Sequence, residues 1–272
     1  MSKEPAASQL LALQKIPCRK IMGLSSQPDL QNLAVVLVRP RNPLNIGAVA
    51  RAMSNFGAER LRLVNPYGVA FREAKSAVNA QDILLNAEEF NTVADAVADC
   101  SLVVGTTAIR DRVLQLPLHR LGATASNLIR KRLKRDRVAL LFGSEKIGLT
   151  NHDFSHCHWL MNITTDAQHI SMNLAQSVAV CLYELARPTR SKATSPTPTA
   201  KPATAGETEQ IAKLMLEGLR ISEYIKPGTE VVTEKKVRRL LLRLKLDEMD
   251  AKVLLGMIRQ MAWKLRQIEK PR

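Results

Sequence analysis

Short, continuously apolar runs recur along this chain, and helical stretches separate most of them. The runs cover residues 33–39 (LAVVLVR), 61–64, 101–105 (SLVVG), 138–142 (VALLF) and 158–163. Each run has the length of a strand that is buried on both faces, and strands that alternate with helices are typical of a parallel sheet covered by helices. We therefore expect an α/β fold with a mostly parallel sheet and helices on both faces.

The composition changes after residue 187. Residues 188–208 are rich in Pro, Ser, Thr and Ala and have no apolar periodicity, which predicts a flexible linker. Beyond it, residues 209–272 predict a small all-α C-terminal module with helices at 209–225, 233–246 and 247–268, the last starting at Asp247. Residues 1–30 lack the apolar core of a secretory signal, so we expect a flexible extension there and the α/β domain at 31–187.

The 272-residue chain carries a formal net charge of +15, which indicates a polyanionic partner, nucleic acid before anionic membrane. Aromatic residues make up only 4% of the chain, which argues against a surface built from base-stacking rings. Two basic clusters favour contact with RNA or DNA, although a solvated charged face explains either one alone. They comprise Lys236, Arg239 and Arg243, and Arg130, Lys131, Arg132, Lys134, Arg135 and Arg137.

Cysteine spacing and the lengths of the apolar runs indicate the cellular compartment. None of the four cysteines forms a C-x-x-C pair, which favours reduced thiols in a cytoplasmic protein. They are Cys18, Cys100, Cys157 and Cys181. No apolar run approaches the length of a membrane span, so we expect no membrane partner.

Residues 151–159 (NHDFSHCHW) gather His152, His156, Cys157 and His158. Zinc needs about four converging ligands, and on a strand Cys157 would point away from its two histidine neighbours. A second ligand pair at conventional spacing is missing, so we expect no metal.

Two glycines in residues 142–150 (FGSEKIGLT) have the spacing of a phosphate-binding P-loop, but Leu149 stands where that loop has its lysine. This argues against nucleotide hydrolysis. No G-x-G-x-x-G fingerprint follows any expected strand, so a dinucleotide site has no support either.

Residues 37–53 (LVRPRNPLNIGAVARAM) join the first expected strand to a helix. Pro43 ends the strand segment, Asn45 is placed to cap the helix, and Gly47 lets a backbone or a ligand approach closely. Arg51 lies one turn beyond Gly47. A structural arginine that reaches to water is the alternative to a ligand-binding one.

Ser171 and Asn173 lie at the start of another apolar helix. Capping explains both residues, and a helix N-terminus is also a site for an anion or for the polar groups of a ligand. Position alone leaves both interpretations open.

Four motifs occur together in a fixed order. They are N-x-G-x-x-x-R at Asn45, Gly47 and Arg51, VVGTTA at 103–108, LLFGSEKIGLT at 140–150, and SMNLAQSVAV at 171–180. In this order and spacing the chain resembles the SPOUT superfamily of RNA methyltransferases (TrmH/SpoU class), and specifically its TrmJ-like branch. The resemblance runs from about residue 33 to 186 and continues into the C-terminal helices.

The resemblance implies a trefoil knot near the end of the α/β domain, an exception to the rule that chains do not thread. It also implies S-adenosyl-L-methionine as cofactor and a homodimer in which Arg51 of the partner subunit completes each active site. The implied cofactor-binding residues are Thr106, Thr107, Ala108, Gly143, Glu145, Gly148, Ile163, Ile170, Ser171 and Met172.

The resemblance further implies methyl transfer to a ribose 2′-hydroxyl, most closely that of a tRNA (cytidine/uridine-2′-O)-methyltransferase acting at position 32 of the anticodon loop. We expect Arg51 to grip the adjacent phosphate, because a guanidinium rarely gives up its proton to act as a base. Ser171 would orient the hydroxyl, Asn45 would hold its loop, and Arg110 and Arg112 would hold the RNA backbone. The alternatives are an rRNA 2′-O-methyltransferase and a non-catalytic RNA-binding protein on the same scaffold.

Overall fold

The computed structural model describes residues 30–67, 81–108, 116–166, 168–187 and 201–269, in which seven strands form one sheet. The strand order is β3-β2-β1-β6-β4-β7-β5, and every neighbouring pair is parallel. The strands are β1 (Leu33–Val38), β2 (Arg60–Val64), β3 (Glu88–Phe90), β4 (Leu102–Thr106), β5 (Leu118–Arg120), β6 (Val138–Phe142) and β7 (Trp159–Asn162). The expected parallel sheet is confirmed.

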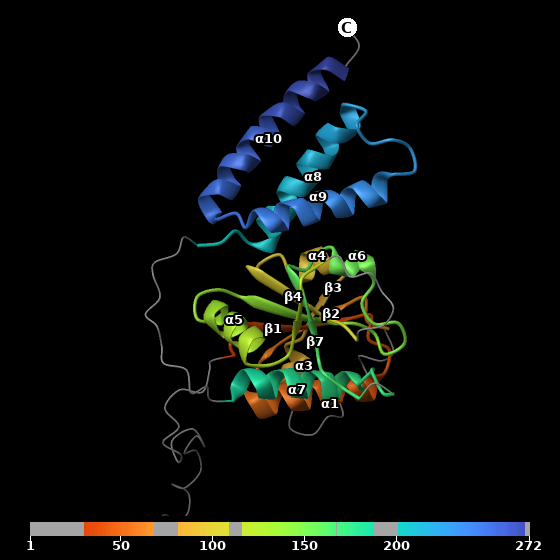
Figure 1. The fold of residues 1–272 in the computed structure, drawn as a ribbon, viewed down its shortest axis with the longest axis vertical. Helices are drawn as coiled ribbons and strands as arrows, with labels where there is room; N and C mark the ends of the chain where they lie inside the picture. Colours follow the sequence, from red (N-terminus) through yellow and green to blue (C-terminus); the bar gives the residue numbers. More distant parts are fainter. Residues whose placement is uncertain (1–29, 68–80, 109–115, 167, 188–200, 270–272) are drawn as a thin grey trace, which may run out of the picture.

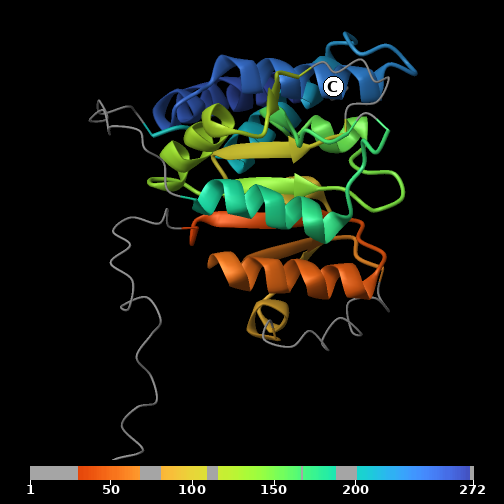
Figure 2. The same cartoon turned by 60° about the horizontal axis from the view of Figure 1, so that its bottom comes forward.

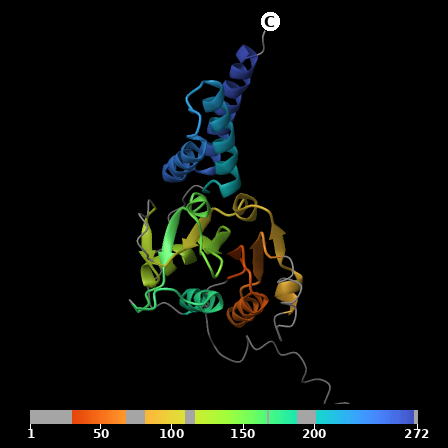
Figure 3. The ribbon, with the colours of Figure 1, turned by 90° about the vertical axis from the view of Figure 1, so that its right-hand side faces the viewer.

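Helices cover both faces of this sheet, as expected (Figure 1). In this domain they are α1 (Pro43–Phe56), α3 (Gln81–Leu85), α4 (Val93–Ala96), α5 (Ala123–Leu133), α6 (Asn151–Phe154) and α7 (Leu174–Ala186). Because side chains alternate along a strand, the odd-numbered residues of β1 belong to one apolar cluster with α1, α5 and α7. The even-numbered residues belong to a second cluster with α4 and α6. Figure 3 looks along α1 and α7, which lie side by side under the sheet.

The five expected strands are present with ends that differ by at most one residue, whereas β3 and β5 were not expected from the sequence. Both are three-residue strands at the two edges of the sheet. An edge strand has one neighbour and stays partly exposed, so neither carries the continuous apolar run that marks a central strand.

The C-terminal helices α8 (Ala205–Ile221), α9 (Glu230–Leu244) and α10 (Glu248–Glu269) form the expected all-α module around their own apolar cluster. The backbone N–H of Asp250 donates to Asp247 Oδ1 over 2.8 Å, in keeping with a helix start at Asp247. The first helix begins four residues before the expected 209, because Thr204 and Glu207 form a capping box. Pro202 also pairs with Asp247, so residues 201–208 belong to the module and not to the linker.

The helical module docks on the sheet face opposite α1 and α7 (Figure 2). The first N–H groups of a helix have no partner within it. In α8, Ala205 donates to the carbonyl of Cys100 and Gly206 to that of Ala98, each over 2.7 Å. The contact between module and sheet domain therefore uses the free end of a helix.

Three described cysteines, Cys100, Cys157 and Cys181, are buried free thiols, and burial raises the pKa of Cys181 to about 12. Among the helices that the structure describes, none combines the length and the apolar character of a membrane span.

Candidate functional site

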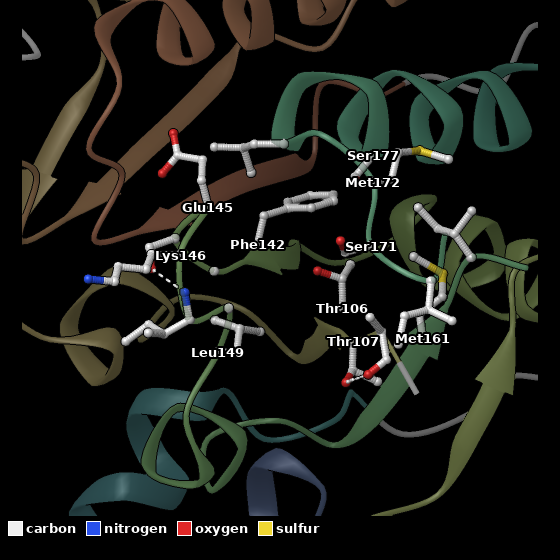
Figure 4. Close-up of a pocket in the computed structure, with 18 of the residues that line it drawn as sticks. Thr106, Thr107, Phe142, Glu145, Lys146, Leu149, Met161, Ser171, Met172 and Ser177 are labelled. Atoms are coloured by element: carbon white, nitrogen blue, oxygen red, sulfur yellow. Dashed lines mark hydrogen bonds between the residues drawn. The ribbon is translucent and has the colours of Figure 1, made fainter. Parts of the chain in front are cut away.

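A cavity of about 400 Å³ opens at the carboxyl edge of the sheet, where the loops after β4, β6 and β7 meet (Figure 4). These three strands are neighbours in the sheet. In parallel α/β sheets, ligands bind in the crevice at this edge.

The lining of this cavity includes all ten residues that the resemblance assigns to the cofactor. The sequence reasoning missed half of the lining, which also includes Phe142, Ser144, Lys146, Ile147, Leu149, Phe154, Met161, Thr165, Leu174 and Ser177. Several of these are immediate neighbours of the expected residues, and Phe142 and Met161 lie at or near the carboxyl ends of their strands. Proximity to those strand ends was the available signal.

The loop after β4 is tied to both neighbouring strands. Thr106 Oγ1 donates to the carbonyl of Leu141 over 2.8 Å, and the N–H of Thr107 donates to that of Met161 over 2.9 Å. The side-chain amide of Asn162 donates to the carbonyl of Thr107 over 3.0 Å. These bonds fix the floor of the cavity before any ligand binds.

The loop after β6 folds back tightly on itself. A Cβ at Gly143 would lie 2.0 Å from the carbonyl carbon of Gly148 and 2.2 Å from the nitrogen of Leu149, so only glycine fits there. Gly148 has φ +66°, and a Cβ there would meet nothing within 4 Å. The positive φ at Gly148 turns the loop back, and the N–H of Gly148 donates to the carbonyl of Ser144 over 2.8 Å. In Figure 4 the Lys146 side chain points away from the cavity, unlike the lysine of a P-loop.

A bidentate ion pair anchors the far end of the same loop. Arg39 Nη1 and Nη2 donate to the two carboxylate oxygens of Asp153 over 3.1 and 2.5 Å. Thr150 and Asp153 also form the capping box of α6. Burial opposes ionisation of Asp153, but the bonds from Arg39 and Thr150 outweigh it and lower the pKa of this carboxyl.

Asn173 begins α7 and starts a network that crosses three loops. Its Oδ1 caps the N–H groups of Ala175 and Gln176, which is one of the two roles that the sequence left open. Its Nδ2 donates to Asn45 Oδ1 over 3.1 Å, and Asn45 Nδ2 donates to Glu145 Oε1 over 2.7 Å. The start of α1, the loop after β6 and the start of α7 are thereby joined.

The expectation that Asn45 caps α1 is wrong. The cap is Asn42, whose Oδ1 accepts from the N–H of Leu44 over 2.9 Å. The reason is Pro43, which occupies the first helical position, where a missing N–H has no cost. Asn45 is the third residue of α1, where its side-chain amide contacts Glu145.

Glu145 is held in the ionised form by this network. Burial raises the pKa of its carboxyl, but the donor groups around it more than compensate, so that the pKa lies below its ordinary value. The donors are the Asn45 amide and the backbone N–H groups of Arg41 and Asn42. The Glu145 carboxylate therefore holds the β1–α1 connection against the loop after β6, which lines the cavity.

Of the three arginines expected to be catalytic, the structure describes only Arg51, and it lies outside the cavity. Ser171 lines it, whereas Arg51 is exposed on α1 and does not line the cavity of its own chain. Arg110 and Arg112 lie outside the described residues.

The basic cluster near β6 is partly structural, which corrects its assignment to nucleic-acid contact. Arg130 is buried, and it donates to the carbonyls of Glu184, Leu185 and Arg187, which end α7. Arg137 forms an ion pair with Asp99. Arg132 pairs likewise with Asp136, over 3.5 Å.

The histidines near residue 156 contact protein groups. The N–H of Val103 donates to His158 Nδ1 over 3.1 Å, and His156 is buried 4.0 Å from Glu209. Among the residues that the structure describes, no three His, Cys, Asp or Glu side chains are grouped to hold a metal ion.

Comparison with known proteins identifies similar chains. The family model of the SpoU rRNA Methylase family matches residues 32–183. The tRNA (cytidine/uridine-2'-O-)-methyltransferase TrmJ of Klebsiella pneumoniae is 32% identical over 240 residues, which cover 84% of this chain and 96% of that protein. The protein of the same name from Citrobacter koseri is 33% identical over 235 residues. The crystal structure of TrmJ from Z. mobilis ZM4 has a TM-score of 0.73 and 31% identity, and covers 84% of this chain and 98% of that one.

Proposed function

Because this chain belongs to the SpoU rRNA methylase family, we propose that it is an S-adenosyl-L-methionine-dependent methyltransferase that modifies a ribose 2′-hydroxyl of tRNA. The observation that carries the proposal is the cavity, in which three loops far apart in sequence bring all ten expected cofactor residues together. The similarity to tRNA methyltransferases extends over 84% of the chain and so includes part of the helical module. This supports tRNA over other RNAs.

The cavity fits S-adenosylmethionine in size and chemistry. Its volume lies within the range of small-molecule sites. Apolar side chains such as Leu149, Ile163 and Ile170 offer contacts to the flat adenine ring, and Glu145 and Ser171 add polar side chains to the lining. The bound cofactor would supply a methyl group already activated on a sulfonium.

The chain's own residues would position the second reactant. A ribose hydroxyl is a poor nucleophile at neutral pH, so alignment and charge stabilisation have to provide most of the acceleration. Ser171, which lies just before α7, would orient the ribose hydroxyl with its Oγ. Asn45 would act through Glu145 and Asn173, with which it holds the loops in register.

Arg51 would come from a second copy of the chain. It is exposed on α1, outside the cavity of its own chain, and α1 and the neighbouring α7 also carry exposed apolar side chains. Leu44 of α1 is 75% exposed and Tyr183 of α7 is 58% exposed. Homodimer contact through α1 and α7 would cover both side chains and bring Arg51 of the partner subunit to the cavity, where its planar fork suits a phosphate. The trefoil knot and cytoplasmic location belong to the same proposal.

The α9 helix offers a further surface for RNA. Among the described residues, Lys236, Arg239 and Arg243 form no ion pair, whereas Arg238 on the opposite face is buried against Glu209. Unpaired cations on one helix face supply affinity for phosphates. This supports a nucleic-acid partner for the helical module.

Methyl transfer tests the function directly. Wild-type protein with labelled S-adenosylmethionine and unmodified tRNA transcripts should place label in tRNA, with ribosomal RNA as the matched alternative substrate. Label in ribosomal RNA alone would contradict the tRNA assignment. RNA binding with no transfer to either RNA would indicate a non-catalytic scaffold.

A further inference from the structure

A second, smaller cavity of about 170 Å³ adjoins the first, between the ends of β5 and β7. It is lined by Arg120, Asn162, Ile163, Thr164, Thr165 and Ile170. Three of these, Ile163, Thr165 and Ile170, also line the larger cavity. A ligand in the smaller cavity would therefore lie directly beside one in the larger cavity.

The floor of the smaller cavity is fixed by main-chain pairing. Arg120 is the last residue of β5 and pairs in register with Asn162, the last residue of β7. The N–H of Leu121 donates to the carbonyl of Asn162 over 2.7 Å. The Asn162 amide also donates to Thr107, so this cavity is built on the same rigid edge as the cofactor loops.

The polar groups around this cavity suit an anion. Arg120 is exposed, and among the described residues it forms no ion pair, in contrast to Arg130 and Arg238, whose guanidinium groups are used within the fold. Thr164 and Thr165 add two hydroxyl donors. The nearby acid, Asp166, does not line the cavity, and its carboxylate accepts from the N–H of Gln168 over 2.8 Å.

We propose that this smaller cavity binds a backbone phosphate of the RNA strand next to the nucleotide being methylated, with Arg120 as its cation. A guanidinium beside two hydroxyl groups matches the donors that a phosphodiester accepts. The cofactor fits the smaller cavity less well than a phosphate does, because Arg120, Asn162 and Thr164 line the smaller cavity and not the larger one. The inference rests on the proposed function, since it names a subsite for the same RNA.

The test compares Arg120→Gln with Arg60→Gln, measuring tRNA affinity against salt concentration. Arg60 is a matched control because it lies at the amino end of β2, away from the carboxyl edge of the sheet. Arg120→Gln should weaken tRNA binding about tenfold and lower the slope of log affinity against log salt by about one. Arg120→Lys should keep the wild-type slope and recover part of the affinity, because it retains the charge without the fork. Arg60→Gln should change neither quantity by a comparable amount.

Calorimetric titration with S-adenosylmethionine separates the two possible ligands. Arg120→Gln should bind the cofactor with wild-type affinity, and lost cofactor affinity with unchanged tRNA binding would overturn the proposal. If wild-type protein methylates tRNA but Arg120→Gln binds tRNA with wild-type affinity and slope, the subsite is refuted and the proposed function stands. If wild-type protein neither binds nor methylates tRNA, the proposed function fails and the subsite fails with it.

Discussion

At the scale of single residues, Gly143 is the position where the cavity tolerates least change. Its Cα lies so close to the returning loop that a Cβ would fall within 2.5 Å of three backbone atoms of Gly148 and Leu149. Backbone cannot move aside as a flexible side chain can, so Gly143→Ala has to open the loop.

Gly143→Ala should weaken S-adenosylmethionine binding by roughly tenfold to a hundredfold, in line with about 1–3 kcal/mol for overpacking a closed site. Calorimetric titration measures this affinity. Gly122→Ala is the matched control, because a Cβ at Gly122 meets nothing within 4 Å. Equal affinity in both variants would show that the loop does not form the cofactor site.

A substitution at Arg51 tests whether this side chain contacts the RNA in the active site. Arg51→Lys keeps the positive charge and loses the planar fork. If Arg51 grips a phosphate bidentately and stabilises the developing alkoxide, methyl transfer to tRNA should fall about a hundredfold while cofactor affinity stays unchanged. Full activity in single-turnover transfer assays would contradict the bidentate role.

At the scale of elements, the amino end of α8 holds the helical module on the sheet domain. A Cβ at Gly206 would lie 2.7 Å from the carbonyl oxygen of Ala98, which also accepts the hydrogen bond from the N–H of Gly206. Both the close approach and the bond depend on the missing side chain.

Gly206→Ala should therefore lower the free energy of unfolding by about 1–3 kcal/mol and reduce tRNA affinity, because the module undocks. Gly218→Ala in the same helix is the control: its nearest new contact is Leu265 at 3.7 Å, and alanine favours a helix by about 0.5–1 kcal/mol. Urea denaturation followed by circular dichroism measures both. A stabilising effect of Gly206→Ala would refute this docking contact.

The elements also show where sequence reasoning succeeds. The central strands were predictable because strands buried on both faces have to be continuously apolar, as in residues 138–142. The motif resemblance selected the three loops that line the larger cavity. Capping at Asn173 was one of two interpretations that its place before an apolar helix left open, and the structure shows the cap.

Other features depend on tertiary partners that spacing does not reveal. In the sequence, Arg130 looks like a surface charge. In the structure its guanidinium donates to the carbonyl of Leu185 at the end of α7, 55 residues away in the chain. The three-residue edge strand β5 has no apolar signal, and so the smaller cavity beside Arg120 was not foreseen. Asn45 was misassigned because its real contact, Glu145, comes from a loop 100 residues away.

At the scale of the whole molecule, a buried histidine links the two units. His156 lies just beyond α6, and Glu209 of α8 is 4.0 Å from its Nδ1. Arg238 of α9 pairs with the same Glu209. Burial, with a further contribution from Arg238, lowers the pKa of His156 to about 4. The histidine is therefore neutral at this contact at neutral pH.

This shift predicts acid lability. In the unfolded chain His156 titrates near 6.5, so between about pH 6.5 and 4 the unfolded state binds the extra proton and stability falls as pH falls. The free energy of unfolding should lose about 2 kcal/mol from this group between pH 7 and pH 5. Urea denaturation at both values checks this, and His156→Asn should show a smaller loss. An equal loss in wild type and variant would rule out His156 as a source of the effect.

Locating the transferred methyl group tests the proposed 2′-O-methylation of tRNA. After reaction of wild-type protein with S-adenosylmethionine and an unmodified tRNA transcript, nuclease digestion and mass spectrometry identify the modified nucleoside and its position. We expect one 2′-O-methylated pyrimidine at position 32 of the anticodon loop. A methyl group on a base, or tRNA recovered without modification while the cofactor is bound, would contradict it.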